Sequence, residues 1–297
     1  WLVPKKEFQT RSGVDEFFKS FSFNSFYKIN ASYHNIIRVN LILRSKIYKS
    51  SYKRVVYVGT SVPFFIIRLN FKIDWFINGI PEEKLFHGNT IIKRFKINLF
   101  WKLLRFTTNA EMVIGVSKNM SRYLSQKLIA NEFISVPSGI YNKKISLNNV
   151  VRSRKIVYSG SGAPWQWIDR ISMLWQQIHL KDPFIEFLVI SRDPRCDILK
   201  NGINPEQISF KSALNVNEVH EFLQEGIIGF LIRKNDLVNQ VSFPIKFGEY
   251  LSAGLNVVVS DIDWDCASFI IEHGCGVLID NENIEDSVDK ILSFIYS

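Results

Sequence analysis

The sequence predicts an α/β protein built from two domains with mostly parallel sheets. Of its 297 residues, 46% are hydrophobic and 22% are charged, which is enough apolar material for two cores of ordinary size. Short apolar runs alternate along the chain with helical patterns, and this alternation favours parallel strands joined by crossover helices. A polar, broken segment at residues 137–150 separates the two halves. We therefore expect an N-terminal domain at residues 1–150 and a C-terminal domain at residues 151–297.

The strands are predicted in order from the apolar runs. They occupy residues 54–58, 112–116, 155–158, 184–190, 207–210, 227–232 and 257–260. Two of the helices between them have recognisable beginnings, because Ser and Asn side chains can accept a hydrogen bond from the first helical turn. One helix is expected at residues 117–130, starting at Ser117. Another is expected at residues 215–224, starting near Asn215, with Asn217 as an alternative cap.

The most informative segment covers residues 242–260, which read as a helix, a glycine and a strand. Ser242 can cap a helix that carries Pro244 in its first turn. Gly254 can end that helix in a left-handed conformation, after which the apolar run 255–259 enters a strand. The helix therefore points one end at the edge of a sheet.

Two charged residues of this helix, Lys246 and Glu249, stand three positions apart and so share one face near its start. An ammonium group close to the positive end of a helix suits a phosphate. A carboxylate one turn later can accept two hydrogen bonds from a ribose diol. The alternative is an exposed salt bridge between the two side chains.

The run Pro-Ile-Lys-Phe-Gly-Glu-Tyr-Leu-Ser-Ala-Gly-Leu at residues 244–255 resembles the nucleotide-sugar signature of the family-four retaining glycosyltransferases. Three weaker resemblances fall in the order that this family requires. Residues 74–83 resemble a strand end with a donor-facing loop, residues 113–120 a strand-to-helix turn, and residues 155–162 a first strand with its glycine loop. The resemblance covers roughly residues 55–285. It implies the GT-B fold, in which two Rossmann-like domains face a central cleft.

The resemblance also implies an activity, the transfer of a sugar from a nucleoside-diphosphate-sugar donor to a polysaccharide or lipid-linked saccharide acceptor. The anomeric configuration would be retained, and neither a metal nor another cofactor would be needed. Positive side chains would neutralise the leaving diphosphate, a glutamate would hold the donor ribose, and loop amides would cover the phosphates. The residues expected to act in catalysis are Lys246, Arg233 and Asn78. Those expected to bind the donor are Glu249, Gly160, Ser161, Gly162 and Tyr250.

The sequence departs from the family pattern at three places. Val241 stands where the family often has a first glutamate, eight residues before Glu249, and Asn78 stands where relatives often have His or Arg. The loop after Gly160 offers residues 163–167, Ala-Pro-Trp-Gln-Trp, in place of the Arg and Lys that often clamp the diphosphate. Arg233, at the end of an apolar run, is the best replacement cation, with a surface ion pair as its alternative role.

The cysteines and histidines indicate neither a disulfide framework nor a metal site. Three cysteines, an odd number, form no close motif, and five histidines are scattered along the chain. This usage favours a reducing, cytoplasmic setting. The cysteines are Cys196, Cys266 and Cys275, and the histidines are His34, His87, His179, His220 and His273.

The net charge of +9 hides an asymmetry between the two halves. Residues 1–150 carry 24 Lys and Arg against 8 Asp and Glu, a balance of +16, whereas residues 151–297 carry 13 against 20, a balance of −7. Residues 91–106 mix cations with large apolar side chains at helical spacing, as helices on membrane surfaces do. We therefore expect an anionic membrane surface as a partner of this segment, or else a helix that packs on the core and turns its cations to water. No nucleic-acid partner is expected.

No run of eighteen apolar residues occurs, so at most a peripheral position on the inner face of a membrane is predicted. The start of the chain lacks a signal-peptide pattern and also the first strand and glycine turn of a complete N-terminal domain, so a fragment is expected. Two other functions stay open. A sugar-nucleotide epimerase would share the fold but would need a paired acid and base. A catalytically lost subunit or a basic binding module would explain Val241 and Asn78.

Overall fold

The computed structural model describes residues 54–59, 72–107, 110–139, 153–200 and 205–297. The chain divides into two compact units, Trp1–Pro137 and Ser138–Ser297. The expectation of an incomplete start falls on residues before 54 and lies outside the described ones, as does most of the segment expected to link the domains.

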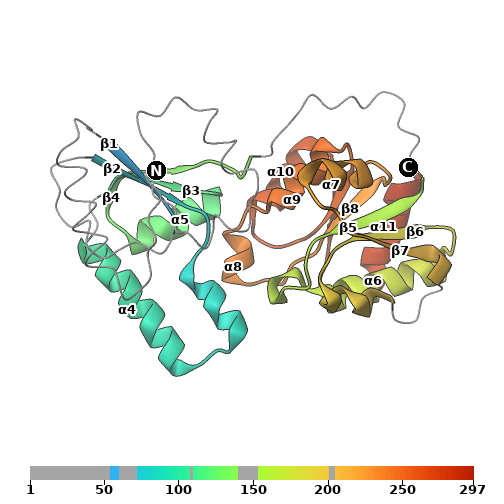
Figure 1. The fold of residues 1–297 in the computed structure, drawn as a ribbon, viewed down its shortest axis with the longest axis horizontal. Coiled ribbons are helices and arrows are strands. Elements are labelled where there is room, and N and C mark those ends of the chain that lie inside the picture. The colour runs from blue at the N-terminus through green and yellow to red at the C-terminus, as the bar shows by residue number, and fades with distance from the viewer. Residues whose placement is uncertain (1–53, 60–71, 108–109, 140–152, 201–204) are drawn as a thin grey trace. The chain divides into compact units, whose positions relative to one another are not determined.

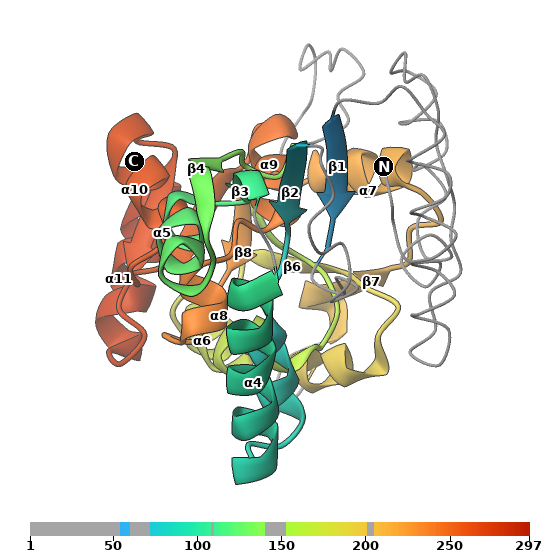
Figure 2. The same ribbon diagram turned by 90° about the vertical axis from the view of Figure 1, so that its left-hand side faces the viewer.

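The N-terminal unit contains a four-stranded parallel sheet in the order β1-β2-β3-β4 (Figure 2). Tight packing of β3 on the following helix requires a glycine, because a Cβ on Gly115 would lie 2.9 Å from the Ser121 hydroxyl oxygen. Buried side chains of this core include Trp75, Val113 and Leu124. The strands are β1 (Arg54–Val58), β2 (Lys72–Ile77), β3 (Ala110–Gly115) and β4 (Ala130–Ser135), and the helices are η2 (Pro81–His87), α4 (Ile91–Thr107) and α5 (Lys118–Lys127).

The C-terminal unit contains a six-stranded parallel sheet in the order β10-β9-β8-β5-β6-β7. The chain therefore starts in the middle of the sheet at β5, builds outward to β7, and then returns to build the other half from β8. This is the doubly wound order, and ligands of such sheets bind beyond the carboxyl ends of the two central strands. The strands are β5 (Lys155–Ser159), β6 (Glu186–Ile190), β7 (Ile208–Lys211), β8 (Ile228–Leu231), β9 (Asn256–Ser260) and β10 (Gly276–Ile279).

Helices cover both faces of this sheet (Figure 1). One apolar core joins the sheet to α6 and α11 through residues such as Trp175 and Ile291, and another joins it to α9 and α10 through residues such as Phe247 and Ile270. The helices are η3 (Pro164–Gln166), α6 (Ile168–Lys181), η4 (Pro194–Lys200), η5 (Pro205–Gln207), α7 (Val216–Leu223), α8 (Leu237–Gln240), α9 (Ile245–Ser252), α10 (Asp265–His273) and α11 (Ile284–Tyr296).

The α/β class and the parallel sheets are confirmed, and each of the seven predicted strands overlaps an observed one. Three observed strands were not among those predicted from apolar runs. β2 was expected only through the family resemblance, as a strand end within residues 74–83. β4, with the sequence Ala-Asn-Glu-Phe-Ile-Ser, is a half-exposed strand at the sheet edge, and polar residues interrupt its apolar pattern. β10 has only four residues and begins with a glycine, which weakens its strand pattern.

The helix starts agree with the sequence in two cases and differ in a third. The side chain of Ser117 accepts a hydrogen bond from the amide of Met120 at 2.8 Å, and that of Asn215 accepts one from the amide of Glu218 at 3.0 Å. Asn215 rather than Asn217 is therefore the cap. The predicted cap at Ser242 is wrong, because Ser242 donates to the carbonyl of Asn239 at 2.9 Å. α9 begins after Pro244 instead.

Candidate functional site

The carboxyl ends of β5 and β8, the two central strands, bring together the glycine loop and the start of α9. A Cβ on Gly160 would lie 1.8 Å from the Nζ atom of Lys246, so only glycine leaves room for this ammonium group. Lys246 Nζ also lies 5.5 Å from the centroid of the Tyr158 ring. Two segments more than eighty residues apart in sequence therefore meet at the place where an open α/β sheet holds its ligand.

Lys246 is a buried cation without a hydrogen-bond acceptor. Its Nζ atom has no partner among the residues that the structure describes. Burial, and after it the nearby charge of Arg233, lowers the pKa of Lys246 from its ordinary 10.5 to about 7. An unpaired buried ammonium is costly, and a bound anion would remove that cost.

Arg233 follows β8 and is only 3% exposed. Its Nη1 atom donates to the carbonyl of Trp165 at 3.0 Å and to the side-chain carbonyl of Gln166, while its Nε atom is buried without a partner in the described part of the chain. Burial lowers the pKa of this guanidinium. The backbone amide of Arg233 donates to the Ser260 hydroxyl at 2.8 Å, which ties the residue to β9. The alternative of a surface ion pair is wrong for Arg233, because the side chain is buried and bonded to neutral groups.

Glu249 lies one turn after Lys246 on α9 and is half-buried. Burial raises the pKa of its carboxyl group, and the charge of Lys246 opposes that rise. The salt bridge between Lys246 and Glu249 that the spacing allowed does not form, since neither residue takes part in an ion pair within the described ranges. The two charges are therefore both available to a ligand.

The glycine loop after β5 is held by hydrogen bonds to its neighbours. The amide of Gly160 donates to the carbonyl of Ile190 at 3.0 Å, and the amide of Gly162 donates to Asp193 Oδ2 at 2.9 Å. Two of the three amides expected to cover phosphates are therefore already paired. The Ser161 amide has no acceptor in the described structure, and the Ser161 carbonyl accepts from the Tyr158 hydroxyl at 2.6 Å.

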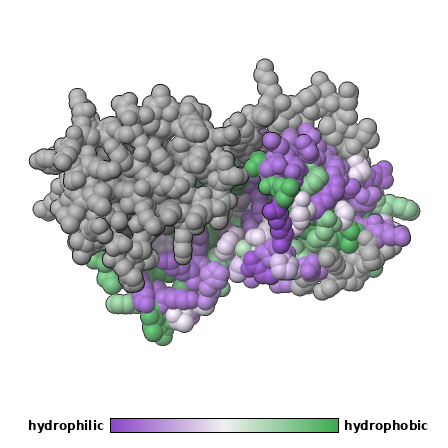
Figure 3. Space-filling view, in the orientation of Figure 1, coloured by the Kyte–Doolittle hydropathy of each residue, from purple (hydrophilic) through white to green (hydrophobic). Residues whose placement is uncertain are grey.

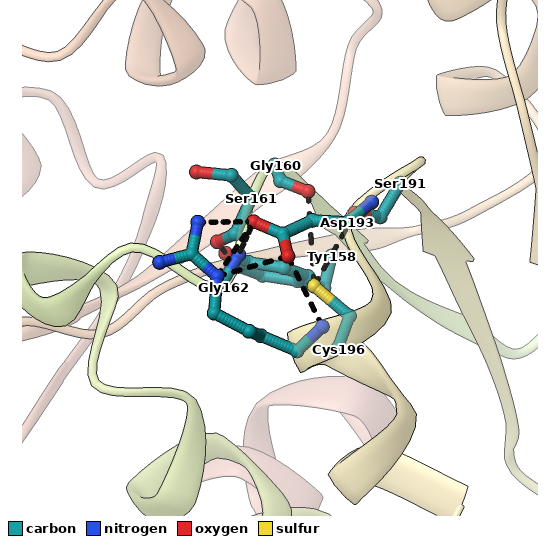
Figure 4. Close-up of polar contacts among 8 residues, drawn as sticks. Tyr158, Gly160, Ser161, Gly162, Ser191, Asp193 and Cys196 are labelled. Carbon is teal, nitrogen blue, oxygen red and sulfur yellow. Dashed lines mark hydrogen bonds and ion pairs between the residues drawn. The ribbon is translucent and has the colours of Figure 1, made fainter.

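An ion pair that the sequence interpretation did not include lies against this loop (Figure 4). Asp193, in the loop after β6, accepts from Arg195 Nη2 at 2.5 Å, and these hydrogen bonds hold the pKa of the Asp193 carboxyl well below its usual range. The Arg195 side chain is 58% exposed, and its Cβ would lie 2.4 Å from a Cβ on Gly162. The cation that residues 163–167 do not supply thus reaches the loop from η4, the short helix that follows the neighbouring strand β6.

Tyr250 does not reach the surface. Its side chain is fully buried, and its hydroxyl accepts from the amide of Ser159 at 2.8 Å and donates to the carbonyl of Phe230 at 3.2 Å. A Cβ on Gly229 would lie 2.5 Å from the Tyr250 ring, so glycine is needed in β8 at that point. Tyr250 therefore positions α9 against β5 and β8, in place of the donor contact that was expected of it.

Asn78 belongs to the N-terminal unit, where it follows β2 directly. Its side chain is exposed and has no hydrogen-bond partner in the part of the chain that the structure describes. A Cβ on Gly79 would lie 2.7 Å from Glu83 Oε1, so the Glu83 side chain packs closely on this loop. Asn78 is thus available to a ligand of its own unit.

Val241 lies at the end of α8 and is 3% exposed. An apolar side chain stands in the core at the position where the family often has a glutamate. The side chain of Val241 can therefore make no polar contact with a sugar.

Two hollows adjoin the glycine loop. One, of about 410 Å³, is bounded by the ends of β5 and β6, and the other, of about 310 Å³, by the turn before α6. In the second hollow Trp167 adopts a left-handed conformation with φ 48°, and Lys234 Nζ lies 5.8 Å from its ring centroid. The first is lined by Ser159, Gly160, Ser161, Ile190, Ser191, Arg192, Asp193, Ala213 and Val219, and the second by Gly162, Ala163, Pro164, Trp167, Ile168, Asp169, Arg195 and Lys234.

The described residues contain neither a metal-binding cluster nor a membrane-spanning helix. No group of three or more His, Cys, Asp or Glu side chains there is placed to hold a metal ion. None of the helices found there has the length and apolar character to cross a membrane.

Residues 153–296 match the family model described as glycosyl transferases group 1. No curated protein sequence matches the chain significantly.

Several solved structures share the fold at low identity. Sucrose-phosphate synthase from Thermosynechococcus elongatus has a TM-score of 0.66 and 12% identity, and the match covers 92% of this chain and 72% of that one. WaaG, a glycosyltransferase involved in lipopolysaccharide biosynthesis, has a TM-score of 0.64 and 14% identity, and the match covers 93% of this chain and 80% of WaaG. The pneumococcal O-GlcNAc transferase GtfA, in complex with UDP and GlcNAc, has a TM-score of 0.63 and 12% identity, and the match covers 87% of this chain and 53% of GtfA. The predicted GT-B fold is confirmed, and residues 153–296 are similar to the group 1 glycosyl transferases.

Proposed function

We propose that this glycosyltransferase moves a sugar from a nucleoside-diphosphate-sugar donor to a polysaccharide or lipid-linked saccharide, with retention of the anomeric configuration. One observation carries the proposal. Lys246 Nζ and Arg233 Nε are both buried without an acceptor among the described residues, at the switch point of a doubly wound sheet, and the charge of Arg233 acts on Lys246. Two such cations in one place fit a ligand with more than one negative charge.

The donor diphosphate would satisfy both cations. In the reaction the bond between the sugar C1 and the β-phosphate oxygen breaks, and its electron pair stays on that oxygen. Lys246 and Arg233 would stabilise the charge that grows there, and the Ser161 amide would donate to a phosphate oxygen. The acceptor hydroxyl oxygen forms the new bond to C1, and its proton leaves with the departing phosphate. No step requires a metal or a further cofactor.

Glu249 would bind the donor ribose through its carboxylate. The residue lies one turn beyond Lys246 on α9 and makes no ion pair in the described structure. The absence of a salt bridge between Glu249 and Lys246 supports this role, because a carboxylate that is already paired would not accept two hydrogen bonds from the ribose hydroxyls. The hollow at the ends of β5 and β6 is next to the same loop and offers room for the base.

The proposed setting is cytoplasmic. Its support is that all three cysteines are free thiols, two of them buried, Cys196 and Cys266. Free buried thiols are typical of proteins that fold in a reducing compartment.

The first test is a thermal shift with UDP, GDP, dTDP and CDP, because a ligand that binds only the folded state raises its stability, by about 2.7 kcal/mol at a hundred times Kd. UDP is the leading choice, since GtfA and TarM structures contain it. We expect one nucleotide to raise the Tm of the wild type, and we expect Lys246→Ala and Glu249→Ala to abolish the rise. Lys290→Ala, which removes only a surface pair with Asp286, is the matched control. No shift with any nucleotide would contradict the proposal.

A catalytically lost partner subunit is the second candidate, and the burial of Val241 favours it. Such a protein could still bind nucleotide. A wild type that gives a thermal shift but releases no nucleoside diphosphate from any donor, with or without acceptor, would select this function over the first.

A further inference from the structure

Helix α4 has two apolar faces, of which the described part of the unit covers only one. Ile97, Trp101 and Leu104 are buried, and Trp101 Nε1 donates to Glu82 Oε1 of η2 at 2.8 Å. The Trp101 ring also meets that of Tyr123, on α5, at 5.9 Å between centroids. This face joins α4 to its own domain.

The second face is an exposed apolar stripe formed by four residues. At about 100° of helix rotation per residue, they fall within one narrow sector on the side opposite to the buried face. The stripe consists of Ile92, Phe95, Leu99 and Phe106, whose exposed fractions are 65%, 66%, 44% and 87%. Such a stripe costs free energy in water and marks an interaction site.

The charges of α4 are all of one sign. The helix carries five basic residues and no acidic one. None of the five forms an ion pair in the described structure, and three of them donate only to neutral oxygens, Lys93 to His87, Arg94 to Asn89 and Arg105 to Gln126. By the same rotation Lys96 and Lys102 flank the apolar stripe, one on each side. In Figure 3 hydrophobic residues accordingly lie beside hydrophilic ones in the region that α4 occupies in Figure 1.

We propose that α4 docks the protein on an anionic bilayer surface. The apolar stripe enters the boundary between headgroups and acyl chains, and Lys96 and Lys102 beside it contact lipid phosphates. The helix has 17 residues, about 25 Å at 1.5 Å per residue, and its charges make it lie in the plane of the surface. The balance of +16 in residues 1–150 adds a long-range attraction to the same surface.

A second copy of the chain fits this face less well. In a two-fold dimer the same surface meets itself, so the lysines beside one stripe would face those of the other without acidic residues between them. Like charges brought together across an interface are repulsive. An anionic bilayer offers an apolar interior for the stripe and negative charges for the lysines beside it.

The test is flotation of the full chain with vesicles of phosphatidylcholine alone and of phosphatidylcholine mixed with phosphatidylglycerol. We expect binding to the mixed vesicles only, weakened by salt. Phe95→Ser/Leu99→Ser and Lys96→Glu/Lys102→Glu should each weaken it by about tenfold or more. The matched controls lie in the C-terminal unit, Phe184→Ser, at an 84% exposed position, and Lys181→Glu/Lys290→Glu, and they should bind as the wild type does.

Size-exclusion chromatography of the same variants completes the test. Membrane docking predicts that the wild type is monomeric in solution and that the α4 variants keep the Tm and the nucleotide shift of the wild type. A wild-type dimer that both α4 variants dissociate would overturn the proposal in favour of self-association. So would a wild type that binds no vesicles, or vesicle binding that the α4 variants leave unchanged.

Discussion

Two regions of the molecule hold cations without counter-ions, and they differ in burial. At the site in the C-terminal unit, Lys246 Nζ and the Arg233 side chain are both buried. On α4 in the N-terminal unit, Lys96 and Lys102 lie on the surface beside exposed apolar side chains. Buried unpaired charge is costly and so indicates a small anion held at fixed positions, whereas exposed charge costs little and fits a large anionic surface.

Lys246→Met should have the largest effect on nucleotide binding. Removing one partner of a buried charge contact costs roughly 2–5 kcal/mol, so binding of the preferred nucleoside diphosphate should weaken at least about thirtyfold. The ligand-free protein should become more stable, because an unpaired buried cation is gone. Calorimetric titration and thermal unfolding measure the two effects. A variant that binds nucleotide as well as the wild type would show that Lys246 is not the phosphate contact.

The same variant should change how stability depends on pH. The folded pKa of Lys246 is about 7 and its ordinary value is 10.5, so between these limits the unfolded chain binds more protons than the folded one. Stability of the ligand-free wild type should therefore rise with pH from about 7 to 10.5. Lys246→Met should lack this part of the rise.

Gly160→Ala should have the next largest effect on nucleotide binding. The new Cβ would displace the flexible end of Lys246, and the positive φ of Gly160, 159°, would add some backbone strain. We expect nucleotide affinity to fall by roughly tenfold or more, with a smaller change in Tm. Gly139→Ala is the control, because a Cβ there has no heavy atom within 4 Å. Equal affinities for the two alanine variants would break the link between Gly160 and Lys246.

Arg195→Ala should have a moderate effect. The guanidinium lies beside the glycine loop and is largely exposed, so a charge-assisted contact with a phosphate is worth about tenfold in affinity at low salt. The loss should shrink as salt is added, in contrast to that of Lys246→Met. A salt-independent loss would show that Arg195 acts through Asp193 and the loop rather than on the nucleotide.

Lys96→Ala/Lys102→Ala should have the smallest effect on the folded protein. Surface substitutions usually change stability by less than about 0.5 kcal/mol, and neither lysine has a partner to lose among the described residues. Thermal unfolding and nucleotide shift should match the wild type. A clear gain in stability would show that the charges of these lysines destabilise the fold, as the buried charge of Lys246 does. The two regions would then not differ in the cost of their unpaired cations.

The sequence was sufficient for the features that depend on local pattern. The strands, the caps at Ser117 and Asn215 and the placing of Lys246 and Glu249 on one helix follow from spacing along the chain. It was insufficient where contacts join distant segments. Tyr250 bonds to Ser159, 91 residues away, and this contact is what buries it.

The paired amides of the glycine loop show the same limit. Gly162 donates to Asp193, 31 residues further on, so the loop that was expected to offer three amides offers one. Arg195 was missed for a related reason, because its approach to Gly162 depends on the pairing of β5 with β6. Nothing in the order of residues near either segment specifies that meeting.

The measurement that tests the central claim most directly is the number of protons taken up when the nucleotide binds. Calorimetric titration of UDP at pH 8, in two buffers of different ionisation enthalpy, gives this number. Lys246 is mostly neutral at that pH, and a bound diphosphate would restore its charge, so the wild type should take up about one proton per nucleotide and Lys246→Met none. Binding of UDP by the wild type without proton uptake would contradict the claim that Lys246 holds the diphosphate.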